Sequence, residues 1–132
     1  MATLKAEDAQ AALENLDKFV LAYPESKVLG PVYSLMTECY STLGNPEKRL
    51  ACEIKALEHR ELDPNNPRAD NSGAYWKIAN LAEFRAGDFE TARKYYGKLL
   101  EEYPTDQKGF ATEKALERLN RTEALLKAGK RP

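Results

Sequence analysis

The sequence is short of the residues that build metal sites and disulfide frameworks. Its 132 residues include two cysteines, one histidine and one tryptophan. Two thiols and a single imidazole are too few for a structural zinc site, so we expect no metal and no cofactor. We predict that Cys39 and Cys52 are small buried residues, because free cysteine is among the most buried residue types. A disulfide between the two is the alternative.

Strong net charge and long apolar runs are also absent. The formal charge is −1, from 20 basic and 21 acidic residues, so no overall field favours nucleic acid or an anionic membrane. No apolar run reaches the roughly 18 residues that cross a bilayer, and the first eight residues lack the basic and apolar regions of a secretion signal. We expect no nucleic-acid binding and no direct membrane insertion. The compartment is unknown: cytoplasmic by default, and periplasmic or envelope-associated if the chain is excised from a longer precursor.

Motifs of the common catalytic classes are missing as well. The sequence contains no glycine-rich phosphate loop, no His-Glu-x-x-His and no Gly-x-Ser-x-Gly, the patterns that bind phosphate, hold catalytic zinc or present a nucleophilic serine. A carboxylate does stand beside the imidazole in the run from Glu58 to Glu61. Adjacent residues on a helix point in different directions, so this run predicts a solvated face. We expect no enzymatic activity and no catalytic residue.

What the sequence does contain is a repeated helical pattern interrupted by proline. Pro24, Pro64 and Pro104 lie forty residues apart in both intervals, and each follows a stretch with the apolar spacing of an amphipathic helix. Proline ends such a stretch because it lacks an amide proton, and a fixed period of this length indicates a repeat array. No segment alternates like a strand. The spacing predicts helices over residues 6–23, 29–43, 46–62, 73–86, 89–103 and 108–128.

Residues 73–104 resemble one tetratricopeptide repeat. The family signature places a tryptophan on the first helix, a glycine at the turn, and a small residue, an aromatic and a final proline on the second helix; the matching residues are Trp76, Gly87-Asp88-Phe89, Ala92, Tyr96 and Pro104. The sequence departs from the signature with Ala79-Asn80 in place of Leu-Gly and Glu83 in place of tyrosine. HEAT-type helix pairs also have periods near 40 residues, but they do not account for this motif.

The resemblance weakens toward both ends of the chain. Residues 25–64 are a degenerate repeat in which Tyr33, Tyr40 and Gly44 occupy the signature positions, with about three residues added in the second helix. Residues 6–24 resemble an unpaired second-type helix, and 105–128, with mixed charges, a C-terminal capping helix. The resemblance implies an all-α fold in one domain, 1–132, with 65–104 as the well-matched repeat. Its antiparallel helix pairs, about six helices, would stack as a short right-handed superhelix.

The family uses such stacks as scaffolds that bind a peptide or protein segment on the concave face. The resemblance places on that face the following residues: Lys77, Leu81, Phe84 and Arg85 from the well-matched repeat, and Ser34, Glu38 and Thr42 from the degenerate one. An apolar anchor between basic residues predicts an acidic, extended or helical segment. Packing between repeats is the alternative for Leu81 and Phe84. The Lys and Asn clamp that some members use for acidic chaperone tails is absent, so we expect no such binding.

A second hypothesis concerns the unpaired first helix. A second-type helix without its partner exposes part of an apolar face, and such patches tend to be covered; the residues concerned are Leu13, Leu16, Phe19 and Val20. Either a second copy covers them, making the chain a self-associating structural module, or the chain belongs to a longer array. The Tyr-Pro spacing is similar in style to bacterial envelope repeat lipoproteins, which would favour a longer bacterial array.

Overall fold

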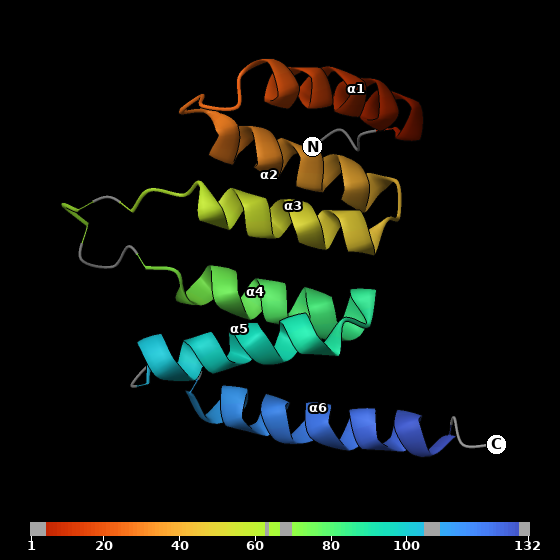
Figure 1. Ribbon diagram of the computed structural model, residues 1–132, viewed down its shortest axis with the longest axis vertical. Helices are drawn as coiled ribbons and strands as arrows, with labels where there is room; N and C mark the ends of the chain where they lie inside the picture. The colour runs from red at the N-terminus through yellow and green to blue at the C-terminus, as the bar shows by residue number, and fades with distance from the viewer. Residues whose placement is uncertain (1–4, 63, 67–69, 105–108, 130–132) are drawn as a thin grey trace. The chain divides into compact units, whose positions relative to one another are not determined.

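The computed structural model describes residues 5–62, 64–66, 70–104 and 109–129. Regular structure in these residues is entirely helical, with six α-helices and one five-residue π-helix (Figure 1). The predicted all-α class with six helices is confirmed. Two compact units divide the chain, residues 1–69 and 70–132, and each is described by itself below. Whether they form the single domain expected from the sequence stays a prediction.

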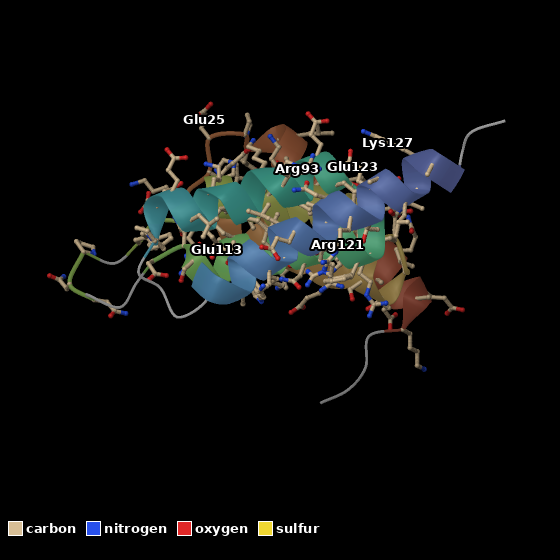
Figure 2. The ribbon with its side chains drawn as sticks, turned by 90° about the horizontal axis from the view of Figure 1, so that it is seen from below. Glu25, Arg93, Glu113, Arg121, Glu123 and Lys127 are labelled. Atoms are coloured by element: carbon tan, nitrogen blue, oxygen red, sulfur yellow. The ribbon has the colours of Figure 1, made fainter. Side chains whose placement is uncertain are left out.

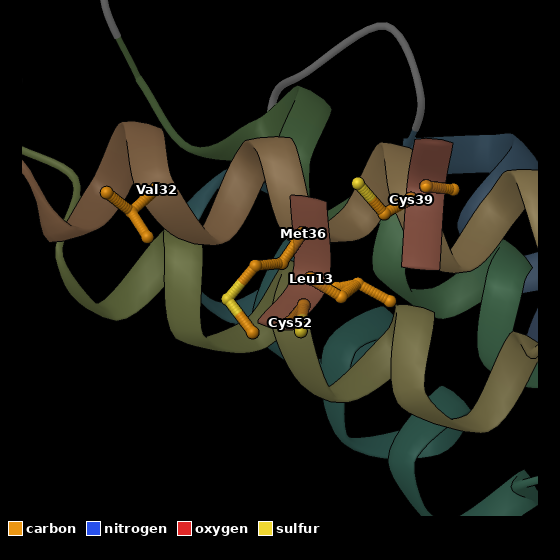
Figure 3. Packing of buried hydrophobic residues seen from close by; sticks show 6 residues of the cluster. Leu13, Val32, Met36, Cys39 and Cys52 are labelled. Carbon is orange, nitrogen blue, oxygen red and sulfur yellow. The ribbon is translucent and has the colours of Figure 1, made fainter. Parts of the chain in front are cut away.

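The first unit contains three helices, α1 (Ala6–Ala22), α2 (Leu29–Thr42) and α3 (Pro46–Glu58). Successive helices pack against one another, α1 on α2 and α2 on α3, and Figure 1 shows them side by side. Their core is aliphatic and sulfur-rich (Figure 3), with these buried residues: Ala9, Leu13, Val32, Met36, Cys39 and Cys52. The apolar stripes predicted for the first two helices therefore face each other.

The turn between α2 and α3 is built by three residues in succession. Gly44 adopts a positive φ of 68°, which glycine reaches without the steric cost that a Cβ imposes. The side chain of Asn45 then accepts a hydrogen bond from the backbone N–H of Lys48 at 3.1 Å, satisfying one of the donors left free at a helix start. Pro46 occupies the first position of α3, where no amide proton is needed.

Helix α3 ends four residues earlier than the spacing predicts. It stops at Glu58 rather than at 62, and Leu62 is exposed. No apolar residue stands between Leu57 and Leu62, so a longer helix would have no buried side to pack. Helix α3 has 13 residues and is no longer than the 14-residue α5 of the second unit. The roughly three extra residues that the sequence analysis expected within this second helix therefore follow it instead.

The second unit begins with a helix that changes its winding. Helix α4 (Ser72–Leu81) continues as the π-helix η1 (Ala82–Ala86), so the predicted helix over 73–86 is right in extent but not in type. A π-helical segment widens the turn by one residue, and it is rare enough to mark a special site. Gly87, with φ of 66°, ends it. The Asp88 N–H then donates to the Ala82 carbonyl at 2.9 Å.

Helix α5 (Phe89–Glu102) starts with a cap of the kind the sequence predicts. The Asp88 carboxylate accepts from the Thr91 backbone N–H at 3.1 Å and from the Thr91 hydroxyl at 2.6 Å. At the other end of α5, Tyr103 accepts a hydrogen bond from the Asn71 backbone N–H at 2.9 Å. The same phenol ring lies beside Tyr75 of α4, with ring centroids 6.0 Å apart. Polar and aromatic contacts thus fix both ends of this helix pair.

Helix α6 (Gly109–Gly129) packs on α5 along one side only. Thr112, Ala115 and Leu119 are fully buried on that side. Arg93 of α5 pairs with Glu123 of α6, and Figure 2 shows the two side chains next to each other. The remaining surface of α6 is strongly charged, as the exposed residues labelled in Figure 2 illustrate: Glu113, Arg121 and Lys127.

Candidate functional site

The residues expected on the binding face divide between the two units and differ in exposure. In the second unit Lys77 lies exposed on α4, and Phe84 and Arg85 lie exposed on η1. Leu81 is buried, with 6% of its surface exposed. Phe84 and the two basic residues therefore lie on the surface of the second unit, whereas Leu81 belongs to the interior, which was the alternative given for it.

Phe84 stands out because a large aromatic side chain is left in water. Its exposed fraction is 60%, and the guanidinium carbon of Arg118 lies over the ring at 4.9 Å from the centroid. A cation over an aromatic face is held by the ring quadrupole. Helix α6 therefore supplies a guanidinium against one face of the ring, while most of the ring surface stays exposed.

Arg118 is itself anchored to a buried carboxylate. Its Nε donates to Glu83 Oε2 at 2.9 Å and its Nη2 to Glu83 Oε1 at 2.7 Å, the two-pronged geometry in which guanidinium and carboxylate fit best. The Glu83 side chain is 4% exposed and the Arg118 side chain 40%. One arginine thus connects a buried charge on η1 to an exposed aromatic on the same turn.

Tyr96 completes the group from α5. Its hydroxyl donates to Glu83 Oε1 at 2.8 Å, and its ring meets Trp76 edge to face with centroids 5.7 Å apart. Burial alone would raise the pKa of Glu83. The hydrogen bonds from Arg118 and Tyr96 and the charge of Arg118 outweigh burial, so the pKa of Glu83 lies below its ordinary value of 4.5. Burial and the bond to Glu83 raise the pKa of Tyr96. Glu83 is therefore ionised and Tyr96 protonated at neutral pH.

This network explains the departures from the repeat signature. Glu83 stands where the family has an aromatic residue, and here a carboxylate fills the position because tyrosine and arginine donors come from α5 and α6. Asn80, in the position of the signature glycine, turns its amide back to the Trp76 carbonyl at 2.8 Å. Sequence reasoning noted Glu83 as a mismatch but missed Arg118, because thirty-five residues separate the two partners.

The candidates in the first unit lie on one helix. Ser34, Glu38 and Thr42 are all exposed on α2, as a binding face requires. The structure also exposes two apolar residues of this helix, Pro31 and Leu35, which the sequence analysis did not place on a binding face. Leu35 is 51% exposed and is turned away from the core. Leu35 follows Val28 by seven residues, about two helical turns, so the two residues lie on the same outer side of α2. This spacing is the sequence signal for an exposed apolar side.

The four residues expected to mediate self-association pack within the first unit. Leu13 is part of the buried core, and Leu16, Phe19 and Val20 lie partly buried against that core. Helix α2 therefore covers much of the apolar side of α1. Leu13 is therefore covered within its own unit, and for Leu16, Phe19 and Val20 the self-association expected from the sequence stays a prediction.

The two cysteines and the histidine have structural surroundings. Cys39 and Cys52 are buried and free, so the disulfide alternative is not realised. Burial raises the pKa of the Cys52 thiol to about 11 and also raises the pKa of Cys39, which keeps both in the unreactive thiol form. His59 is exposed and stacks on Tyr33, with ring centroids 5.6 Å apart. Over the described ranges, no three metal-ligating side chains gather in one place, and no helix there is long and apolar enough to span a membrane.

Comparison with known proteins agrees with the geometry of the second unit. Residues 74–106 match the family model of the tetratricopeptide repeat, which confirms the resemblance inferred from Trp76 to Pro104. No curated protein matches the chain, and no solved structure does. The matched segment contains Phe84, Glu83 and Tyr96 but ends before Arg118. The tetratricopeptide repeat is in general a module for protein-protein interaction without catalysis.

Proposed function

We propose that this protein is a non-catalytic interaction module that binds an acidic protein segment through the exposed surface of α4 and η1. The observation that carries the proposal is the supported aromatic ring of Phe84, 60% exposed and resting on the Arg118 guanidinium at 4.9 Å. Aromatic residues dominate binding energy at interfaces because they bury a large area for little lost rotamer freedom. A contact such as that with Arg118 favours one ring orientation before binding, which lowers the entropy lost on binding.

The charge around Phe84 favours one kind of partner. Lys77 is exposed on α4, one residue after Trp76, and Arg85 follows Phe84 directly. Positive side chains beside an apolar anchor attract segments that carry aspartate or glutamate next to an apolar residue. Leu81 takes no part, since it is buried. Leu81 also has no donor or charge to bind a carboxylate at this clamp position, which supports the expectation that acidic chaperone tails are not ligands.

A selection experiment tests both the anchor and the charge. Peptides selected from a random display library against the purified chain are expected to carry an apolar residue flanked by acidic ones. Phe84→Ala is expected to weaken binding of a selected peptide at least tenfold in calorimetry, as interface anchors typically do. Arg85→Glu is expected to weaken it less, and to weaken it less still in high salt, because exposed charges are screened.

The matched control is Leu125→Ala, which removes another exposed apolar side chain and leaves the proposed surface intact. Circular dichroism confirms that each variant is folded. The proposal is wrong if the selected peptides lack acidic residues, or if Phe84→Ala and Leu125→Ala bind them equally well. Micromolar affinity for an acidic chaperone tail would overturn the narrower expectation about that ligand.

A further inference from the structure

The outer side of α2 carries an apolar strip that faces water. Val28 and Leu35 are 50% and 51% exposed, and they stand seven residues apart, two turns along one side of the helix. Pro31, also exposed, lies between them. Four of the eight exposed large hydrophobic residues that the structure describes fall within residues 21–35. Single exposed leucines are ordinary, but an aligned group indicates a surface that becomes covered.

The equivalent position in the second unit shows what such a residue ordinarily does. The turns Gly44-Asn45 and Gly87-Asp88 correspond, because each joins a positive-φ glycine to a capping residue. Counting back nine residues from each glycine brings Leu35 onto Ile78. Ile78 is 1% exposed and Leu35 is half exposed. The same repeat position is thus filled with an apolar residue in both units and covered in only one.

Charged residues border the strip in a self-complementary order. Lys27 precedes Val28, and Glu38 follows Leu35 by three residues; both are exposed. If a second α2 is laid antiparallel across the first, about a two-fold axis near Pro31, each Val28 meets a Leu35 and each Lys27 approaches a Glu38. Val28 caps the start of α2 and Lys27 lies in the turn just before it. Along the sequence, the midpoint of Val28 and Leu35 and the midpoint of Lys27 and Glu38 are about one residue apart, so both pairings have nearly the same centre.

We propose that this strip, Val28, Pro31 and Leu35 with Lys27 and Glu38 at its ends, is a two-fold self-association surface and that its occupant is the same strip of a second copy. A surface that pairs with itself around a two-fold axis closes after two copies. Because the strip pairs with itself, continued head-to-tail growth is not expected. The inference does not depend on the peptide site proposed on the second unit.

The interface is small, so association is expected to be weak and dependent on concentration. Sedimentation velocity of the full chain from micromolar to millimolar concentration is expected to show a monomer converting to a dimer and to nothing larger. Leu35→Glu is expected to weaken the dimer at least tenfold, because it places two carboxylates in an apolar contact. Phe84→Ala is expected to leave the dimer unchanged, which separates this surface from the peptide site.

Charge reversal tests the two-fold geometry itself. Lys27→Glu and Glu38→Lys each place like charges opposite one another and are expected to weaken the dimer several-fold at low salt. The double variant Lys27→Glu with Glu38→Lys restores opposite charges and is expected to restore the wild-type association. Lys18→Glu, on an exposed lysine of α1, is the control for charge alone and is expected to have little effect.

Four results would overturn the proposal. The first is a strict monomer at every concentration, which would leave the strip to another protein or to a further helix of a longer chain. The second is a dimer that tolerates Leu35→Glu in a variant shown to be folded by circular dichroism. The third is a double charge-reversal variant no more dimeric than the single ones, because the paired arrangement of Lys27 and Glu38 would then be wrong. An assembly that grows beyond two copies would likewise contradict the closed geometry.

Discussion

The two units share a turn and differ in what fills the first helix just before it. In the first unit position 40 is Tyr40, partly buried beside an aliphatic and sulfur core. The equivalent position in the second unit is Glu83, whose buried carboxylate is held by Tyr96 and Arg118. One repeat position therefore accepts either an aromatic ring or an ion pair. The carboxylate is tolerated only because two other helices supply donors for it.

The comparison indicates that the second unit needs its last helix, α6, to compensate the buried charge of Glu83. The first unit contains no equivalent dependence at the corresponding position, Tyr40. Removing one partner of a buried pair leaves the other charge without compensation, and this costs more than the pair contributes. In the first unit no such charge stands at the corresponding position. The following variants test that contrast, from the largest expected effect to the smallest.

The largest effect is expected from Arg118→Met, which leaves the Glu83 carboxylate buried without its cation. We expect a loss of about 3 kcal/mol in the free energy of unfolding, the lower end of the range for buried pairs because Arg118 is partly exposed. Denaturation followed by fluorescence of Trp76, the chain's single tryptophan, reports on this unit. Arg121→Met, on an exposed arginine of the same helix, should change stability by less than about 0.5 kcal/mol. Equal effects of the two variants would refute the role given to Glu83.

A smaller loss is expected from Tyr96→Phe, which removes one of the donors to Glu83 and keeps the ring in place. A hydrogen bond to a charged group contributes about 1.5–3 kcal/mol, and Arg118 remains to hold the carboxylate, so we expect about 1.5 kcal/mol. Tyr40→Phe is the counterpart in the first unit and should cost under about 0.5 kcal/mol. If Tyr40→Phe proves the more costly change in urea denaturation, the contrast between the two positions is wrong.

The two helix caps provide a matched pair with a smaller effect. Asn45→Ala and Asp88→Ala each remove a side chain that accepts from the start of the following helix, which costs about 1 kcal/mol. Asp88→Ala should cost more, because Asp88 also accepts from the Thr91 hydroxyl. Alkylation of the buried Cys52 thiol under mild denaturant reports the first unit, and Trp76 fluorescence reports the second. Equal losses would show that the hydroxyl contact adds nothing.

The smallest effect is expected on acidification. The pKa of Glu83 is below 4.5 in the folded chain, so its contribution to stability is complete above that value and is lost as the pH falls through the folded pKa. The melting temperature of Glu83→Gln should therefore be lower than that of the wild type at pH 7. The difference should shrink steadily below pH 4.5. A difference that stays constant down to pH 3 would show that the carboxylate's charge does not matter.

Much of the fold was predictable because its signals are local. Apolar spacing, the glycine turns and the capping residues Asn45 and Asp88 all act within a few residues, and five of the six helices have the expected ends to within one residue. Helix α3 was predicted too long because Pro64 was taken as its stop, whereas the last buried side chain sets the end. The π-helical winding of η1 has no local signal of this kind.

The candidate site was predictable only in part, for the same reason. Phe84 and Arg85 were found because the repeat signature fixes which side of the first helix faces outward. Leu81 follows the same spacing, but its exposure depends on what packs around it. Arg118 was missed because no sequence pattern connects it with Glu83 across the intervening helix α5. A carboxylate at a position where the repeat signature has an aromatic residue predicts that a partner exists elsewhere in the chain. The sequence does not identify which residue that partner is.

The position of Arg118 also constrains how this protein is assembled during synthesis. Residues 74–106, which match the repeat family, are synthesised before Arg118. Until that arginine is available, burying Glu83 would bury an uncompensated negative charge, which is unfavourable. We therefore expect the recognisable repeat to need α6 for its full stability. Its helices can form early, but we expect their final packing around Glu83 to follow the docking of α6.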